Sequence, residues 1–137
     1  MPRKFLTIIT FLLFTATVSA QKTDPEDVVK ASLKAYNSLD LDLFMSYFSE
    51  DIEMKDFDNG TVNAKGKEQV RAIYEAFFKA SPELHSKIID RIIFDNKVMD
   101  HEYITGARGN KEAFEIVVIY EVNEGKITSM LAIRKNN

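Results

Sequence analysis

The stretch Ser86–Thr105, SKIIDRIIFDNKVMDHEYIT, decides the fold. Apolar and polar side chains largely alternate through it, and Asp95-Asn96 divides it into two halves. Such alternation is typical of half-buried β-strands, and Asp and Asn favour tight turns. The stretch therefore predicts a β-hairpin. Two further alternating segments follow at residues 113–122 and 126–134, so we expect four consecutive antiparallel strands.

Helical spacing precedes these strands. Asp24-Pro25 suits the start of a helix, and apolar side chains then recur every three or four residues. A second, short helix is expected from Asp40 and a third over about residues 67–79. Between them we expect one early strand at residues 52–57, or a hairpin that returns over residues 61–64. Helices segregated from a run of hairpins indicate an α+β fold, in which the helices cover one face of a curved sheet.

Residues 1–20, MPRKFLTIITFLLFTATVSA, lie outside this pattern and read as a secretory signal peptide. A basic start at Arg3 and Lys4 precedes an uncharged apolar run, and Val18-Ser19-Ala20 supplies the small residues of a cleavage site. A membrane anchor is the alternative, but the apolar run of about 14 residues is shorter than the roughly 20 that span a bilayer. We therefore expect export to the periplasm or the medium, with one domain at residues 21–137 and no membrane contact after cleavage.

Composition excludes several kinds of function. The 137 residues include no cysteine, so disulfides, thiolate metal sites and a cysteine nucleophile are ruled out. Removing Arg3 and Lys4 with the leader leaves 16 basic and 21 acidic side chains, a net charge of −5, which offers no basic surface to nucleic acid. The two histidines, His85 and His101, lie 16 positions apart on different expected elements and make no metal-ligand spacing. We expect neither a metal nor another cofactor.

Five segments carry a resemblance to a known superfamily: Ala35–Phe44, Phe48–Glu53, Lys65–Val70, Val98–Gly106 and Ile119–Ile127. Their order and spacing resemble the nuclear-transport-factor-2-like superfamily. The chain is identified as an exported bacterial member of its SnoaL-like group, which is similar to ketosteroid isomerase and polyketide cyclases. The resemblance implies a cone-shaped, curved antiparallel sheet whose three N-terminal helices enclose a deep, largely apolar pocket. It also implies dimers that pair sheet to sheet.

Asp56, near the end of the first expected strand, is the sharpest catalytic candidate. By the resemblance it falls where ketosteroid isomerase keeps its catalytic aspartate, and a carboxylate in an apolar pocket would take up a proton near neutral pH. The alternative is that Asp56 and Asp58 belong to a polar turn. The same alignment puts Ser32 at the position of the isomerase's tyrosine and Val117 at that of its second acid, both as ligand contacts. Because neither replaces the lost oxyanion donors, we do not expect ketosteroid isomerase activity.

His101 is the second catalytic candidate and lies in the middle of an expected strand. If its face points into the pocket, His101 could carry a proton and Tyr103 could donate a hydrogen bond to a ligand. If that face points outward, Asp100 and Glu102 are the inward polar groups instead. Periodicity leaves the two possibilities open. On the last strand, Met130 faces the pocket according to the resemblance and is expected to contact a ligand.

The sequence therefore indicates a domain that binds a small apolar or amphipathic molecule, with no assigned reaction. One alternative is a cofactor-free isomerase, lyase or cyclase in which Asp56 or His101 acts as the general base. Another is a non-catalytic dimeric interaction module. Because both faces of the strands after Ile88 are apolar and only one can meet the helices, we expect a homodimer.

Overall fold

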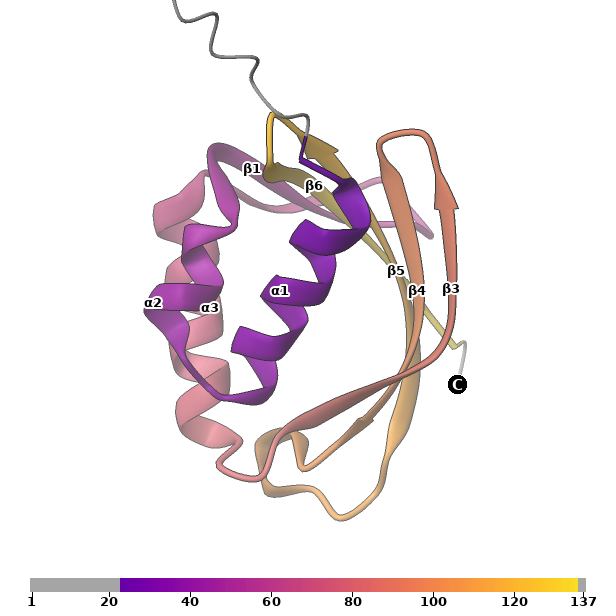
Figure 1. Ribbon diagram of the computed structural model, residues 1–137. Coiled ribbons are helices and arrows are strands. Elements are labelled where there is room, and N and C mark those ends of the chain that lie inside the picture. The colour runs from indigo at the N-terminus through magenta and orange to yellow at the C-terminus, as the bar shows by residue number, and fades with distance from the viewer. Residues whose placement is uncertain (1–22, 136–137) are drawn as a thin grey trace, which may run out of the picture.

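Within residues 23–135, a six-stranded curved sheet carries three α-helices on one of its faces (Figure 1). The structure is a computed structural model that describes these residues, so the signal peptide predicted at residues 1–20 lies outside the described residues. The predicted α+β fold is confirmed. In chain order the elements are α1 (Pro25–Asn37), α2 (Leu41–Ser46), β1 (Phe48–Asp56), β2 (Val62–Lys65), α3 (Lys67–Ala80), β3 (His85–Phe94), β4 (Lys97–Thr105), the 3-10 helix η1 (Ala107–Gly109), β5 (Phe114–Asn123) and β6 (Lys126–Arg134).

The strands of the sheet follow the order β2-β1-β6-β5-β4-β3. The four consecutive strands expected from the alternating pattern form the antiparallel run β3, β4, β5 and β6. The expectation of an antiparallel sheet holds for every pair of neighbours but one. β1 runs parallel to β6, with Met54 opposite Met130. The last strand of the chain therefore lies inside the sheet, between β1 and β5.

β1 is longer than its alternating pattern predicts. It begins at Phe48 rather than at residue 52, and its register with β6 shifts between Phe48 and Glu53. A bulge of this kind lets a strand continue through residues that break the alternation. The backbone N–H of Ile127 donates to the carbonyl of Tyr47 at 2.8 Å and fixes the start of the pairing.

Aspartates define the starts of the first two helices, as the sequence predicts. The side chain of Asp24 accepts from the backbone N–H of Glu26 at 2.9 Å, and that of Asp40 accepts from Leu43 at 3.0 Å. Each cap satisfies an amide that the helix itself leaves unpaired. Within residues 23–135, no helix combines the length and the apolar character that crossing a bilayer requires.

An aromatic cluster holds the helical layer against the sheet. Phe44 of α2 lies at its centre, with its ring centroid 4.6 Å from that of Tyr74 on α3 and 4.8 Å from that of Phe48 on β1. Tyr36 of α1 and Phe78 of α3 complete the cluster, 5.5 Å apart. Tilted and edge-on ring pairs of this kind pack favourably. The cluster therefore fixes how α1 and α3 stand over the sheet, where the cavity described next is formed.

Candidate functional site

A cavity of about 710 Å³ lies between the helices and the sheet. Its inner wall is made of buried apolar side chains from three strands, among them Ile104, Val118 and Met130. Its mouth carries the exposed side chains of Ile73 on α3 and Phe114 on β5. Met130, expected to contact a ligand, thus lines the cavity. A concave space of this size with mostly apolar walls is the usual setting for a small-molecule ligand.

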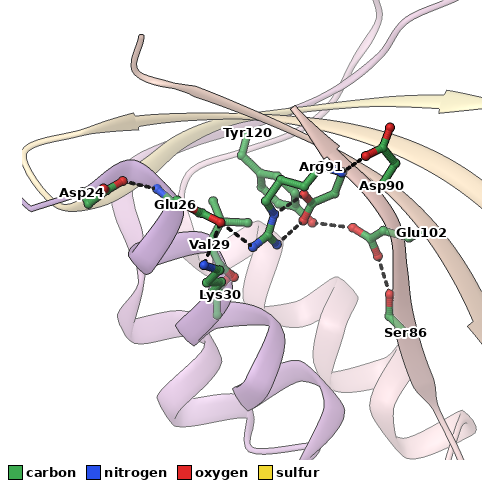
Figure 2. A network of polar contacts seen from close by, with 11 residues as sticks. Asp24, Glu26, Val29, Lys30, Ser86, Asp90, Arg91, Glu102 and Tyr120 are labelled. Carbon is green, nitrogen blue, oxygen red and sulfur yellow. Dashed lines mark hydrogen bonds and ion pairs between the residues drawn. The ribbon is translucent and has the colours of Figure 1, made fainter. Parts of the chain in front are cut away.

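Glu102 is the buried carboxyl group of this cavity. It lies on β4, is 4% exposed, and lines the cavity. Its Oε2 accepts from the Ser86 hydroxyl at 2.7 Å and its Oε1 accepts from the Tyr120 hydroxyl at 2.9 Å (Figure 2). Burial raises the pKa of Glu102 above its ordinary range, and the two hydrogen bonds oppose this shift without cancelling it. Glu102 is therefore a carboxyl group that can exchange a proton inside an apolar cavity.

Three tyrosines surround the same part of the cavity. Tyr36, Tyr74 and Tyr120 all line it, from α1, α3 and β5. Burial raises the pKa of each phenol, and the nearby Glu102 raises it further. Each phenol therefore keeps its proton and remains a hydrogen-bond donor across the physiological range.

Asp100 lies two residues before Glu102 on the same face of β4, but it has a cationic partner. Its side chain is 1% exposed, and Arg91 of β3 donates to both of its oxygens, from Nε at 2.6 Å and from Nη2 at 2.7 Å. Arg91 also lies 3.8 Å from Glu26 of α1, so the pair joins the helix to the sheet (Figure 2). A two-pronged guanidinium–carboxylate contact of this kind is strong and directional. Asp100 therefore has a structural role, whereas Glu102 faces the cavity.

Asn37, the last residue of α1, positions the hydroxyl that contacts Glu102. Its amide group donates to the carbonyl of Ser86 at 2.9 Å and accepts from the backbone N–H of Ser86 at 2.8 Å. This doubled contact fixes the start of β3 against the helix. The Ser86 hydroxyl is thereby held beside the carboxyl group of Glu102.

The structure decides which face of β4 meets the cavity. Glu102 and Ile104 line it, so His101 and Tyr103 project from the opposite face of the sheet, here called the outer face. His101 Nε2 lies 2.9 Å from a carboxylate oxygen of Glu115 on the neighbouring strand. Tyr103 is 42% exposed beside Glu115. Neither residue reaches the cavity, which corrects the interpretation in which they act on a ligand inside it.

Two of the ligand contacts implied by the resemblance also lie outside the cavity. Val117 projects to the outer face, because its neighbours Ile116 and Val118 line the cavity and side chains alternate along β5. Ser32 is 3% exposed within α1, where its hydroxyl donates to the carbonyl of Val29 at 2.9 Å. It does not line the cavity. Val117 therefore misses its predicted ligand contact because it points outward, and Ser32 misses its own because its hydroxyl is used within the helix.

Asp56 has the polar-turn contacts that were the alternative to a catalytic role. Its Oδ1 accepts from the backbone N–H of Asp58 at 3.1 Å, and its Oδ2 accepts from Arg134 at 3.0 Å. Asp56 itself does not line the cavity, but Arg134 does. Asp56 therefore contributes to the rim of the cavity through an ion pair, rather than presenting a carboxylate to its interior.

Several residues of the site could not be identified from the sequence. Glu102 appeared there only as one of two possibilities, and nothing local linked it to Ser86 or Tyr120, which lie 16 and 18 positions away. Arg108 of η1 also lines the cavity, in the segment between two of the predicted strands. Across residues 23–135, no group of three or more histidine, aspartate or glutamate side chains is arranged to hold a metal ion.

Comparison with known proteins shows the family and the fold of the chain. Residues 29–130 match the SnoaL-like domain family. The fold is similar to that of an uncharacterised cystatin-fold protein from Novosphingobium aromaticivorans, with 28% identity, a TM-score of 0.74, and coverage of 82% of this chain and 99% of the other. It is also similar to a protein from Kribbella flavida provisionally named a ketosteroid isomerase (11% identity, TM-score 0.71, 82% and 78% coverage). A SnoaL-like protein of unknown function from Burkholderia thailandensis gives 21% identity, a TM-score of 0.67, and 82% and 94% coverage. The comparison with curated proteins gives no match.

Proposed function

The chain belongs to the SnoaL-like domain family, and from that premise we propose that it binds a small apolar or amphipathic molecule in the cavity between its helices and its sheet. The fold is shared with nuclear-transport-factor-2-like proteins and ketosteroid isomerase-like proteins. A shared fold does not specify a ligand. The proposal therefore depends on the cavity itself.

One observation carries the proposal. The cavity combines buried apolar walls with one buried carboxyl group, Glu102, whose oxygens retain lone pairs beyond those used by Ser86 and Tyr120. Apolar walls stabilise a ligand by removing its surface from water, and a single polar group orients it. A structural core alone would place no ionisable group beside an open volume of about 710 Å³, because burying it is unfavourable.

Mass spectrometry of small molecules that co-purify with the protein tests this proposal. Val118→Phe would fill part of the cavity, so we expect it to reduce the co-purifying ligand strongly. Val117→Phe, at the adjacent position but on the outer face, is the matched control and should retain the ligand. Equal retention by both variants would place the ligand elsewhere and contradict the proposal.

Proton transfer on the bound molecule is a second candidate function, and the position of Glu102 favours it. In this version of the cofactor-free isomerase, lyase or cyclase, Glu102 takes the role that the sequence suggested for Asp56 or His101. The protein would be incubated with its ligand in D₂O and the ligand's mass followed. We expect deuterium to enter carbon positions with the native protein and not with Glu102→Gln. Absence of exchange with both proteins would leave binding as the function.

We also propose that the domain forms a homodimer through the outer face of its sheet. An apolar row crosses four neighbouring strands there: Ile92, Met99, Ile119 and Leu131 stand side by side in the register. Ile92 is 56% exposed. A second copy would remove this row from water. The same surface supports the alternative of a non-catalytic dimeric interaction module.

Export is the remaining proposal, and the sequence of residues 1–20 supports it. A ligand-binding domain without cysteine would meet its ligand outside the cytoplasm with no dependence on disulfide formation. Cell fractionation followed by N-terminal sequencing tests this: we expect the protein in the periplasm or the medium, beginning at Gln21. An uncleaved protein in the cytoplasm would contradict it.

A further inference from the structure

The loop after β4 holds an arginine in an unusual backbone conformation at the mouth of the cavity. Arg108 of η1 has φ 53° and ψ 34°, in the left-handed region. Residues with long side chains rarely adopt this region, because the Cβ atom approaches the following carbonyl. Such a conformation persists only where neighbouring contacts hold it.

Contacts on both sides hold this loop in place. The backbone N–H of Arg108 donates at 2.8 Å to the hydroxyl of Ser81, which is fully buried at the end of α3. At Gly106, with φ 68°, a Cβ atom would lie 2.1 Å from the carbonyl oxygen of Glu83. The loop thus rests directly against the backbone that leads into β3. The position of Arg108 is therefore determined by the fold rather than by its own side chain.

The Arg108 side chain lies among apolar groups at the cavity mouth. Its guanidinium carbon is 5.8 Å from the centre of the Phe77 ring, and both residues line the cavity. Ile73 and Phe114, each 43% exposed, line it as well. None of the ion pairs within residues 23–135 includes Arg108. Its donors are therefore available to a ligand.

The other charged groups of the cavity indicate how a ligand would be oriented. Arg134 also lines the cavity, but it donates to Asp56 at 3.0 Å, so its charge is largely compensated. At the inner end, Glu102 would repel an anion whenever its carboxyl group is ionised. Glu112 lines the cavity as well and is exposed, so it opposes an anion weakly through water. An anionic group is accordingly favoured at one place, beside Arg108.

We propose that Arg108 binds an anionic group of the ligand, so that the cavity accepts a small apolar molecule carrying a carboxylate or another single anionic group at its outer end. This inference rests on the proposed function, because it names the ligand class of the same cavity. The planar guanidinium presents paired N–H donors that match the two oxygens of a carboxylate. The apolar part of the ligand would contact Ile104, Val118 and Met130.

Two fluorescent probes with the same ring system separate charge from apolar contact. 8-Anilinonaphthalene-1-sulfonate carries a sulfonate, and N-phenyl-1-naphthylamine lacks it. In titrations of the protein, we expect Arg108→Gln to raise the Kd of the anionic probe about tenfold. The Kd of the neutral probe should change less than about twofold. Arg108→Lys should give an intermediate result, because lysine keeps the charge and loses the paired donors.

Two further variants serve as controls. Lys111→Gln removes a cation from the same segment that does not line the cavity, and it should leave both Kd values unchanged. Val118→Phe, which fills part of the cavity, should raise the Kd of both probes and so show that both bind in the cavity. If Arg108→Gln affects neither probe, or both equally, the anionic ligand class is overturned while cavity binding stands. If Val118→Phe does not weaken the neutral probe, cavity binding itself is contradicted.

Discussion

Asp100 and Glu102 point to the same side of β4, and Arg91 neutralises only Asp100. Glu102 has two hydroxyl donors instead of a cation. These two buried acids, two residues apart on the same strand, therefore differ in role. One holds α1 against the sheet through Arg91, and the other is presented to the cavity with a raised pKa.

The Glu102 carboxyl group should make the stability of the protein depend on pH. Because its folded-state pKa lies above its ordinary value of 4.5, the folded chain binds more protons than the unfolded chain in the pH window above 4.5. The free energy of unfolding therefore falls as pH rises through that window. Urea denaturation between pH 4.5 and pH 8 should show this decline in the native protein and a flatter profile in Glu102→Gln. Glu68→Gln removes an exposed carboxylate of α3 and controls for the loss of one charge. Equal pH profiles for Glu102→Gln and the native protein would contradict the expectation.

Removal of the Arg91 guanidinium should destabilise the fold strongly. Arg91→Met leaves the Asp100 carboxylate buried without a cation, which costs about 3–5 kcal/mol. The double variant Arg91→Met/Asp100→Leu should recover much of this loss, since both partners are then apolar. Lys30→Met breaks the exposed pair with Glu26 at 2.7 Å and should change the free energy of unfolding by less than about 1 kcal/mol. Chemical denaturation at pH 7 measures the free energy of unfolding of all three variants. Similar losses for Arg91→Met and Lys30→Met would show that the buried pair contributes no more to stability than the exposed one.

Gly106 should tolerate no side chain. A Cβ atom there would overlap the carbonyl oxygen of Glu83 at 2.1 Å and would also require a left-handed residue. We expect Gly106→Ala to lower the free energy of unfolding by about 3 kcal/mol or more, from overpacking together with backbone strain. Gly60 also has a positive φ, of 65°, but no atom lies within 4 Å of the position that an added methyl group would take, so Gly60→Ala should cost only about 1–2 kcal/mol from backbone strain. Equal unfolding midpoints for the two variants would exclude the steric explanation.

The outer face of the sheet should mediate dimerisation. Sedimentation at micromolar concentration should give about twice the monomer mass. Ile119→Lys, in the middle of the apolar row, should shift the protein to monomer, because a buried unpaired charge is unfavourable at an interface. Ile73→Lys changes an exposed apolar residue at the cavity mouth and should leave the dimer intact. A native protein that sediments as a monomer would refute the proposal.

Much of the fold follows from local patterns in the sequence. Two local signals can be recognised without tertiary information, because each involves only residues close together in the sequence. They are the alternation through Ser86–Thr105 and the aspartate caps at Asp24 and Asp40. The parallel pairing of β1 with β6 could not be predicted from the sequence, because it joins residues such as Met54 and Met130 that are far apart in the chain and share no local pattern. Strand partners are chosen by packing across the whole domain.

The candidate site was less predictable for a related reason. Alternation divides β4 into two faces, but only the position of the helices decides that Glu102, and not His101, meets the cavity. Strict alternation would put Ser86 and Arg91 on opposite faces of β3, but the bulge between Ile88 and Asp90 lets Ser86 contact Glu102 while Arg91 contacts Asp100 on the same face. The left-handed conformation of Arg108 has no local signal beyond the glycines around it.

The central position of β6 sets the order in which the molecule can be completed. Residues 126–134 are synthesised after the other five strands of the sheet, yet they separate β1 from β5. Until they emerge from the ribosome, the β1–β2 hairpin has no edge on which to join the other three strands. Contacts this distant in sequence also form late, because closing a long loop is entropically unfavourable. The sheet of this domain can therefore be completed only after residues 126–134 have left the ribosome.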